Sequence, residues 1–404
     1  MMKFLAYLVC YCIYPFSFLF PRRRRKWAFG SFRGAFNDNA KYLFVQVAER
    51  MPEVNSAWLS INRATVRDVR AKGLKAYHVL SPAGIWFALT SKFWFFNAYS
   101  SDIMFCLSGG ATLVNLWHGL PLKRIEFDIT SGPLADRFAK RTLKERYYHP
   151  ETFKRPDYLV SSSAMFSEIF ARCFRISRER CLDIGLARNG ILTCPDAQRK
   201  AFIHRYEPTS TADLIVRMKR YSKVFVYMPT WRDSQDDFIA AGFDFASMEV
   251  ALAEVDALLL VKPHANTVIN PNLVEGLAHV MLLPSSSDVY PILPYTDVLI
   301  TDYSSIMYDY ILMDGKDVIL YLFDQERYGV ERDFYWSFDA MTYGHRAYNF
   351  TMLLDLVRDA NLCPNEAEKS ALVKKCWGAE QGDVCERIAL FFYQASGDAL
   401  PERD

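Results

Sequence analysis

Residues 111–123 read "ATLVNLWHGLPLK", an apolar run that stops at a histidine, a glycine, a proline and a lysine. His118 therefore stands where a strand would end, and an imidazole there can take the proton of an attacking hydroxyl near neutral pH. A buried histidine with satisfied hydrogen bonds would fit the same letters, so the stretch alone leaves both interpretations open. Glu126 and Asp128 in "IEFD" could serve as a base as well, and Lys123 would add positive charge for an anionic acceptor.

Three other predicted strand ends carry polar side chains, in "YMPTWRDS", "LVKPHANT" and "LITDYSSIMYDY". In an open parallel sheet, ligands bind outside the carboxyl ends of the strands, so these side chains are expected to converge. The candidates for binding an anionic donor are Thr230, Arg232, His264, Asp302, Ser304 and Ser305. One polar strand end is ordinary, but several together, with cations and hydroxyls, favour a phosphate site.

The chemistry of each candidate fits a phosphorylated ligand. Ser304 or Ser305 could cap a helix whose first N–H groups and macrodipole attract an anion. Arg232 could hold a diphosphate bidentately, and His264 could hydrogen-bond a phosphoryl oxygen. An ordinary N-cap, an ion pair of Arg232 with Asp233 and a structural histidine are the alternatives. Neither GxGxxG nor GxxxxGK[ST] occurs, which argues against a dinucleotide fingerprint and a P-loop.

The elements that must position these residues alternate between strand and helix patterns, which predicts α/β architecture with parallel sheets and crossover helices. The strands of a first series are predicted at 27–32, 56–61, 75–80, 101–107, 111–117, 157–163 and 180–185, with helices at 38–50, 63–73 and 83–95. A second series has strands at 223–229, 257–263, 278–283, 297–303 and 317–323, with helices at 246–255, 286–294, 304–314, 348–360, 366–377 and 382–395. The two series predict two Rossmann-like domains, over 27–204 and 205–404, that face one another across a cleft.

The overall composition limits the possible classes. Of 404 residues, 51% are hydrophobic and 15% aromatic, which excludes global disorder. A formal net charge of +2 gives no whole-chain argument for nucleic acid, and no nucleic-acid partner is expected. The nine cysteines are scattered without zinc-ligand spacing, which is typical of buried thiols in a reducing compartment.

The N-terminus has an unusual order of apolar and basic residues. Residues 4–20 carry no charge, and "PRRRRK" follows at 21–26. A secretory signal has its positive charge before the apolar part, so this order predicts a membrane-associating segment over 1–26 instead. Cations beside an apolar stretch suit an anionic cytoplasmic membrane face, as a peripheral or short anchor. The alternative is a buried N-terminal helix followed by a solvated basic turn.

Taken in order, "WHGLPLK", "PTWRD", "KPHAN" and "TDYSSIMYDY" resemble the CDP-glycerol glycerophosphotransferase family, which includes teichoic acid primases and polymerases and capsule polymerase relatives. "DNAKYLF" (38–44) and "GLARNG" (185–190) resemble two further segments of that family. The resemblance implies GT-B architecture and a peripheral enzyme of the cell envelope. It implies a CDP-glycerol or CDP-ribitol donor, a lipid-linked saccharide or polyol-phosphate acceptor, and release of CMP. No cofactor or metal is expected, because cations and a helix dipole could stabilise the phosphate and no carboxylates cluster in the sequence.

The resemblance also assigns roles to residues. His118 matches the family's base, while Arg232, His264, Ser304 and Ser305 match its donor-phosphate residues. On this basis His118, Arg232 and His264 are the expected catalytic residues. Two other functions remain open, a GT-B glycosyltransferase that uses a nucleotide sugar and a non-catalytic lectin or scaffold for capsule assembly. Release of CMP from a CDP-polyol would separate the expected function from both.

Overall fold

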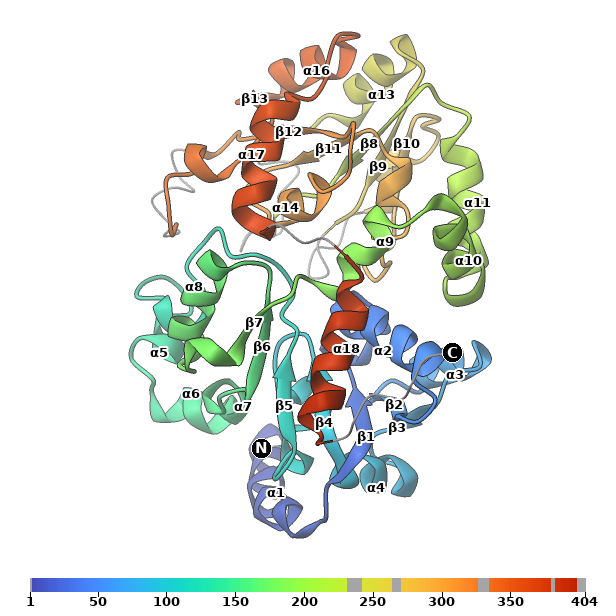
Figure 1. Ribbon diagram of the computed structural model, residues 1–404. Helices are drawn as coiled ribbons and strands as arrows, with labels where there is room; N and C mark the ends of the chain where they lie inside the picture. The colour runs from blue at the N-terminus through green and yellow to red at the C-terminus, as the bar shows by residue number, and fades with distance from the viewer. Residues whose placement is uncertain (1, 231–241, 264–269, 326–333, 379–381, 398–404) are drawn as a thin grey trace. The chain divides into compact units, whose positions relative to one another are not determined.

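The computed structural model describes residues 2–230, 242–263, 270–325, 334–378 and 382–397 (Figure 1). The chain forms two compact units, and each contains a parallel sheet with helices. Unit 1 comprises Met1–Gly119, Ile125–Gly190 and Trp377–Asp404. Unit 2 comprises Leu120–Arg124 and Ile191–Cys376. The fold is therefore α/β, as the alternating sequence pattern predicts.

Unit 1 contains a seven-stranded sheet in the order β3-β2-β1-β4-β5-β6-β7. Its strands are β1 (Arg23–Phe29), β2 (Asn55–Ser60), β3 (Ala76–His78), β4 (Ser91–Phe96), β5 (Thr112–Asn115), β6 (Tyr158–Ser161) and β7 (Cys181–Asp183). Every pairing is parallel, and Ala28 lies opposite Ala57 on one side and Trp94 on the other. The carboxyl ends of all seven strands consequently lie along one edge of the sheet.

Some helices of unit 1 begin at side-chain caps. The helices of this unit are α1 (Met2–Phe16), α2 (Asp38–Arg50), α3 (Arg63–Ala71), α4 (Pro82–Thr90), α5 (Ala135–Phe138), α6 (Leu143–Tyr148), α7 (Pro150–Phe153), α8 (Ala164–Phe174) and α18 (Val384–Ala395), with α9 (Gly190–Thr193) at the boundary to unit 2. Asn62 accepts hydrogen bonds from two N–H groups of the first turn of α3, and Ser81 caps α4 ahead of Pro82. Such caps satisfy backbone donors that the helix itself leaves unpaired.

The last described helix, α18, packs in unit 1. Phe392 meets the rings of Phe93 and Phe95 on β4 at centroid distances of 5.4 and 5.2 Å, and that of Tyr158 on β6 at 5.4 Å. Burying aromatic rings in such edge-on contacts is among the strongest apolar contributions to a core. The structure thus places α18 with the N-terminal sheet, whereas the sequence-based division assigned all of 205–404 to the second domain.

Unit 2 contains a six-stranded parallel sheet in the order β10-β9-β8-β11-β12-β13. Its strands are β8 (Lys223–Tyr227), β9 (Ala257–Val261), β10 (Val280–Leu282), β11 (Val298–Thr301), β12 (Asp317–Tyr321) and β13 (His345–Ala347). Its helices include α10 (Asp196–Tyr206), α11 (Thr209–Met218), α13 (Phe245–Glu254), α14 (Ile306–Tyr310), α16 (Phe350–Arg358) and α17 (Glu366–Trp377). Strand β9, "ALLLV", is buried along its whole length, as expected of a parallel strand covered on both faces.

Several predicted boundaries are wrong. The helix predicted over 83–95 ends at Thr90, and its last residues form β4. The strand predicted over 101–107 is a pair of 3-10 turns, and residues 286–294 form turns instead of a helix. The error is physical in origin, because short buried apolar runs have no periodicity that separates a strand from a helix.

The basic run that follows the apolar N-terminus is divided between surface and interior. Arg23, Arg24 and Arg25 at the start of β1 are exposed, whereas Lys26 is buried. Arg22 turns inward, and its guanidinium donates to the carbonyls of Ala88 (2.6 Å), Leu107 (2.9 Å) and Gly109. Burial lowers the pKa of Arg22 to about 10. In the part of the chain that the structure describes, no helix reaches the length and apolar character needed to cross a bilayer.

Replacing Arg22 tests this inward role. We expect Arg22→Ala to lower the free energy of unfolding by about 2 kcal/mol, because backbone carbonyls lose their donors. The matched variant Arg24→Ala removes an exposed cation from the same run and should change stability by less than about 0.5 kcal/mol. Chemical denaturation followed by circular dichroism measures both, and equal effects of the two variants would contradict the structural assignment.

Candidate functional site

His118 lies three residues beyond the end of β5, at the carboxyl edge of the sheet of unit 1. Its side chain is exposed, and its Nδ1 lies 3.3 Å from the carbonyl oxygen of Asn97, just beyond β4. A carbonyl can only accept, so this hydrogen bond assigns the proton to Nδ1. The Nε2 lone pair is then available as a base.

The residue before the histidine has an unusual backbone. Trp117 adopts a φ of 51°, in the left-handed region that bulky side chains rarely occupy. Two buried asparagines hold both sides of this residue. The Trp117 N–H donates to Oδ1 of Asn115 (2.8 Å), and Nδ2 of Asn39 donates to the Trp117 carbonyl (2.8 Å). Strain of this kind persists only where the surroundings fix it, and here it sets the direction of His118.

A buried arginine joins three distant segments at the same place. Nη1 of Arg188 donates to Oδ1 of Asp38 (2.7 Å) and to the carbonyl of His118 (2.9 Å). The backbone N–H of Arg188 donates to Oδ1 of Asn39 (3.0 Å). "DNAKYLF", "NLWHG" and "GLARNG" therefore meet around one backbone turn. This network holds the backbone of His118 and so positions its imidazole, while the hydrogen bond of the ring to Asn97 uses Nδ1 and not Nε2.

The surroundings also adjust the acidity of the imidazole. The protein around the ring displaces water and lowers the pKa of His118, even though the side chain itself is exposed. The Asp38 carboxylate and the Asn97 carbonyl oppose this shift, while the Arg188 guanidinium adds to it. The net lowering favours the neutral imidazole at pH 7, which is the form that a general base requires.

The three residues predicted to face an acceptor are divided between the two units. Lys123 belongs to unit 2, where its backbone pairs antiparallel with Phe334. Asp128 accepts a bidentate hydrogen bond from Arg172 of α8, with distances of 2.7 to 3.1 Å. Glu126 is buried and accepts from the hydroxyl of Tyr99. The two carboxylates are thus held by side chains of their own unit, so their described contacts are structural.

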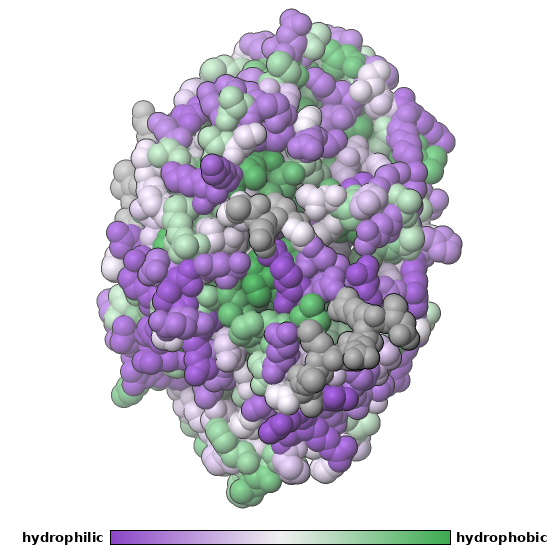
Figure 2. Space-filling model, in the orientation of Figure 1, coloured by the Kyte–Doolittle hydropathy of each residue, from purple (hydrophilic) through white to green (hydrophobic). Residues whose placement is uncertain are grey.

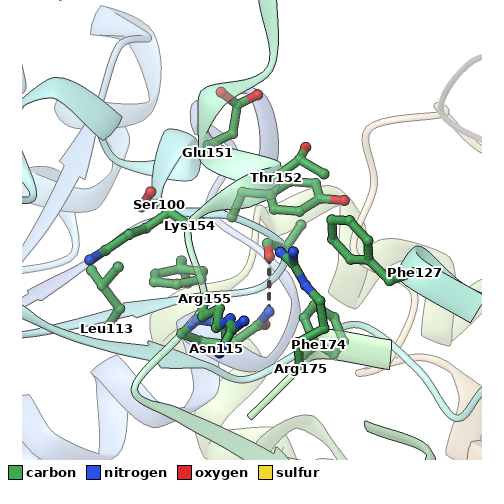
Figure 3. Close-up of a pocket in the computed structure, with 14 residues that line it drawn as sticks. Ser100, Leu113, Asn115, Phe127, Glu151, Thr152, Lys154, Arg155, Phe174 and Arg175 are labelled. Atoms are coloured by element: carbon green, nitrogen blue, oxygen red, sulfur yellow. Dashed lines mark hydrogen bonds between the residues drawn. The ribbon is translucent and has the colours of Figure 1, made fainter. Parts of the chain in front are cut away.

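A narrow cavity lies beside the end of β5 (Figure 3). Its lining includes Asn115, Ser100, Thr152 and Arg175, and its volume of about 10 Å³ has room for about one water molecule. Ser100 Oγ, Thr152 Oγ1 and Arg175 Nε are buried polar atoms without a partner in the described structure. A bridging water would satisfy such atoms, and the cavity is too small for a nucleotide or a sugar.

In unit 2, the predicted donor-binding residues lie at the carboxyl ends of β8 and β11. Asp302 is buried, and its Oδ1 accepts from the N–H of Thr230 (2.9 Å), the hydroxyl of Thr230 and the N–H of Tyr303 (2.7 Å). The structure brings Thr230 and Asp302 together as predicted. Asp302 ties the two strand ends to each other, a role that its position in the sequence did not reveal.

The serine pair lies half-buried at the start of α14. Ser304 Oγ accepts from the N–H of Ile306 at 3.4 Å, whereas Ser305 makes no capping hydrogen bond with its side chain. Helix α14 has five residues, so the predicted helix over 304–314 is too long and its dipole is that of little more than one turn. Arg232 and His264 lie outside the described residues.

Lys262 at the end of β9 is held by backbone carbonyls of its own unit. It is buried, and its ammonium donates to the carbonyls of Ser285 (2.8 Å) and Pro263 (3.1 Å). Burial lowers the pKa of Lys262 to about 8. The side chain therefore supports the loop beyond the strand.

Sequence reasoning missed the side chains that hold His118. These are Asp38, Asn39, Asn97, Asn115 and Arg188. Asp38 and Asn39 open the helix predicted over 38–50, and their residue types are frequent at helix starts, so nothing in the sequence set them apart. One signal could have found them. "DNAKYLF" and "GLARNG" resemble segments of the family, yet no role in the reaction was assigned to their residues, which left a supporting role for them.

Comparison with known proteins agrees with this arrangement of elements. Residues 12–391 match the profile of the family described as CDP-Glycerol:Poly(glycerophosphate) glycerophosphotransferase. A teichoic acid glycerol-phosphate transferase of Staphylococcus aureus is 28% identical over 317 residues, which cover 75% of this chain and 76% of that protein. A teichoic acid poly(glycerol phosphate) polymerase of Bacillus spizizenii is 23% identical over 384 residues, 92% of each chain. The solved wall teichoic acid polymerase TagF shares the fold, with a TM-score of 0.72 and 22% identity over 93% of this chain and 90% of that one.

Two variants test the electrostatic control of His118. Asp38→Asn removes an anion and should lower the pKa of the imidazole, whereas Arg188→Gln removes a cation and should raise it. NMR titration of the imidazole resonances in each variant measures these shifts. Shifts of the same sign in both variants would show that the two charges do not act on His118 as described.

Glu126 gives a second, independent pH dependence. Burial raises the pKa of Glu126 to about 7, so the folded protein holds a proton that the unfolded chain releases near pH 4.5. The stabilising contribution of the protonated form is therefore complete below pH 4.5 and is lost as the pH rises through 7. Glu126→Gln should remove about 2 kcal/mol of the decline in unfolding free energy between pH 5 and pH 8. Denaturant titrations at several pH values measure the unfolding free energy across this range. An unchanged decline in the variant would show that a group other than Glu126 titrates there.

Proposed function

This chain belongs to the CDP-glycerol:poly(glycerophosphate) glycerophosphotransferase family, and from that premise we propose that it transfers a polyol phosphate from a CDP-polyol to a hydroxyl group. The family resemblance carried by the four motifs is thereby confirmed. The donor we favour is CDP-glycerol, because the relatives with the most extensive coverage are named for glycerol phosphate. The acceptor is a lipid-linked saccharide or a growing polyol-phosphate chain of a teichoic-acid-like or capsule polymer.

The proposed reaction is an in-line displacement at the β-phosphorus of the donor. The acceptor oxygen forms a bond to that phosphorus, the bond from the phosphorus to the bridging oxygen breaks, and CMP departs with the electron pair. Nε2 of His118 takes the hydroxyl proton, while Nδ1 keeps its hydrogen bond to the Asn97 carbonyl. The hydrogen bond that fixes this tautomer is the observation that carries the proposal.

The groups of unit 2 serve the donor in this proposal. Ser304 and Ser305 offer hydroxyls at the end of β11, and hydroxyls can donate to phosphate oxygens. The hydroxyl of Thr230 donates to Asp302, so Thr230 serves by holding the adjacent end of β8 beside the serines. Arg232 and His264 are proposed to stabilise the transferring phosphoryl group and the departing CMP. Charge stabilisation of this kind is the main catalytic contribution in phosphoryl transfer, so no cofactor or metal enters the proposed step.

We further propose that α1 rests on the cytoplasmic face of a membrane as an interfacial helix. Figure 2 shows hydrophobic side chains gathered near the bottom of the view, where α1 lies in Figure 1. The exposed apolar side chains of this segment include Phe4, Leu5, Leu8, Val9, Ile13, Phe16, Phe18 and Leu19. The exposed Arg23, Arg24 and Arg25 follow at once and suit anionic headgroups. Such placement would bring the enzyme to a lipid-linked acceptor, and sedimentation with anionic vesicles tests it.

Donor specificity tests the reaction itself. Purified full-length protein should release CMP from CDP-glycerol or CDP-ribitol in the presence of a polyol-phosphate acceptor, with label passing to the acceptor. Transfer from a UDP-sugar without transfer from either CDP-polyol would identify a glycosyltransferase instead. No release of nucleotide from any donor would favour a lectin or scaffold.

Removing the base tests the role of His118. We expect His118→Ala to reduce turnover roughly 100-fold, as the loss of a general base does. In the wild type, kcat/KM should fall as the pH decreases through the lowered pKa of His118, since protonated imidazole cannot accept the proton. Near-normal turnover of the variant, or a flat pH profile below pH 6.5, would contradict the assignment.

A further inference from the structure

A second basic site lies in unit 1, away from His118. Helix α3 and the loop between β3 and α4 enclose a groove of about 740 Å³. Its lining combines three arginines and a histidine with two apolar side chains: Arg63, Arg67, Arg70, His78, Val66 and Leu80. A volume in this range accommodates a substantial ligand, in contrast to the narrow cavity beside β5.

The three arginines share one face of α3. They occupy positions i, i+4 and i+7, and all are exposed. Arg70 is steadied by a hydrogen bond from Nε to the Ala76 carbonyl (2.8 Å). Within the described residues, Arg63 and Arg67 form neither an ion pair nor a side-chain hydrogen bond. Asp68, the acid in this helix, is offset by about 100° from Arg67 and so leaves the face cationic.

This arrangement is electrostatically unfavourable for the protein alone. Like charges at i, i+4 destabilise a helix. Arg63 also stands in the first turn of α3, where the helix dipole disfavours a cation. An anion in the groove would relieve both effects. The paired N–H donors of arginine match the oxygens of phosphate and carboxylate groups.

We infer that the groove formed by Arg63, Arg67 and Arg70 binds phosphodiester groups of the acceptor chain. The inference rests on the proposed function, which supplies an acceptor that carries one negative charge per repeat. The apolar side chains of Val66 and Leu80 can contact the carbon atoms between successive phosphates of the acceptor. A chain held along the length of α3 presents several phosphates to the three cations.

The groove lies at a distance from His118, where the terminal hydroxyl of the acceptor would react. Arg63 follows β2, and the β3–α4 loop follows β3, so the groove opens at the same sheet edge as His118. Strands β3 and β5 are separated by β2, β1 and β4, which places the strands about 19 Å apart at about 4.8 Å per step. The groove therefore binds internal phosphates of the acceptor, while the acceptor's terminal hydroxyl lies at His118. An acceptor with many phosphates should bind more tightly because of the groove, and an acceptor with a single phosphate should not.

Acceptors of two lengths test this inference on the full-length protein. We expect Arg63→Gln/Arg67→Gln to raise KM for a long glycerol-phosphate oligomer about fivefold to tenfold, with kcat unchanged. KM for a short acceptor with one phosphodiester should stay at the wild-type value, which also shows that the variant is folded. The matched control Arg220→Gln removes an exposed arginine of unit 2 and should leave both KM values unchanged. The double variant should also weaken the salt dependence of KM for the long acceptor.

Direct binding separates this inference from the proposed reaction. Fluorescence anisotropy of a labelled glycerol-phosphate oligomer should show weaker binding to the double variant than to the wild type, whether or not any CMP is released. Anionic phosphatidylglycerol vesicles carry the same phosphodiester chemistry, and their binding should be equal for the two proteins. Equal oligomer binding by variant and wild type would overturn the inference. A defect seen only with vesicles would also overturn it, because the groove would then serve the membrane.

Discussion

The left-handed backbone of Trp117 fixes where the imidazole of His118 can point, and that conformation exists only because other segments hold it. Asn39 from α2 and Asn115 from β5 occupy the two sides of the Trp117 residue. Arg188 then joins the His118 carbonyl to the start of α2. A base placed in this way is oriented by buried neutral amides and one guanidinium, so its orientation depends on folding of the whole unit and not on a flexible loop.

Unit 2 uses the same principle with a carboxylate. Asp302 collects donors from the ends of β8 and β11 on a single oxygen, which fixes the backbone on either side of the strand junction. The two serines then present their hydroxyls next to strand ends that Thr230 and Asp302 fix. Rigid placement matters for phosphoryl transfer, because groups that are already oriented need no reorganisation as charge develops.

The long elements and the polar strand ends could be predicted from the sequence, whereas the residues that support them could not. The helices α2 and α17 match the predicted bounds 38–50 and 366–377, because acidic residues in the first turn and basic residues in the last turn are local signals of helix ends. The buried run that forms β4 has no such periodicity, and its strand character is decided by pairing with β1 and β5. Asp38 and Arg188 are far apart in the chain, so their ion pair is visible only in three dimensions.

The packing of α18 has a consequence for how the protein is made. Its ring at Phe392 covers β4 and β6, and the residues of both strands leave the ribosome before any strand of the second sheet does. The nascent N-terminal sheet must therefore carry an uncovered aromatic surface while the entire second sheet is synthesised. Exposed apolar surface of this kind is what chaperones bind and what drives aggregation. A chain truncated before residue 384 would retain His118 and its network but would never acquire the final piece of its core.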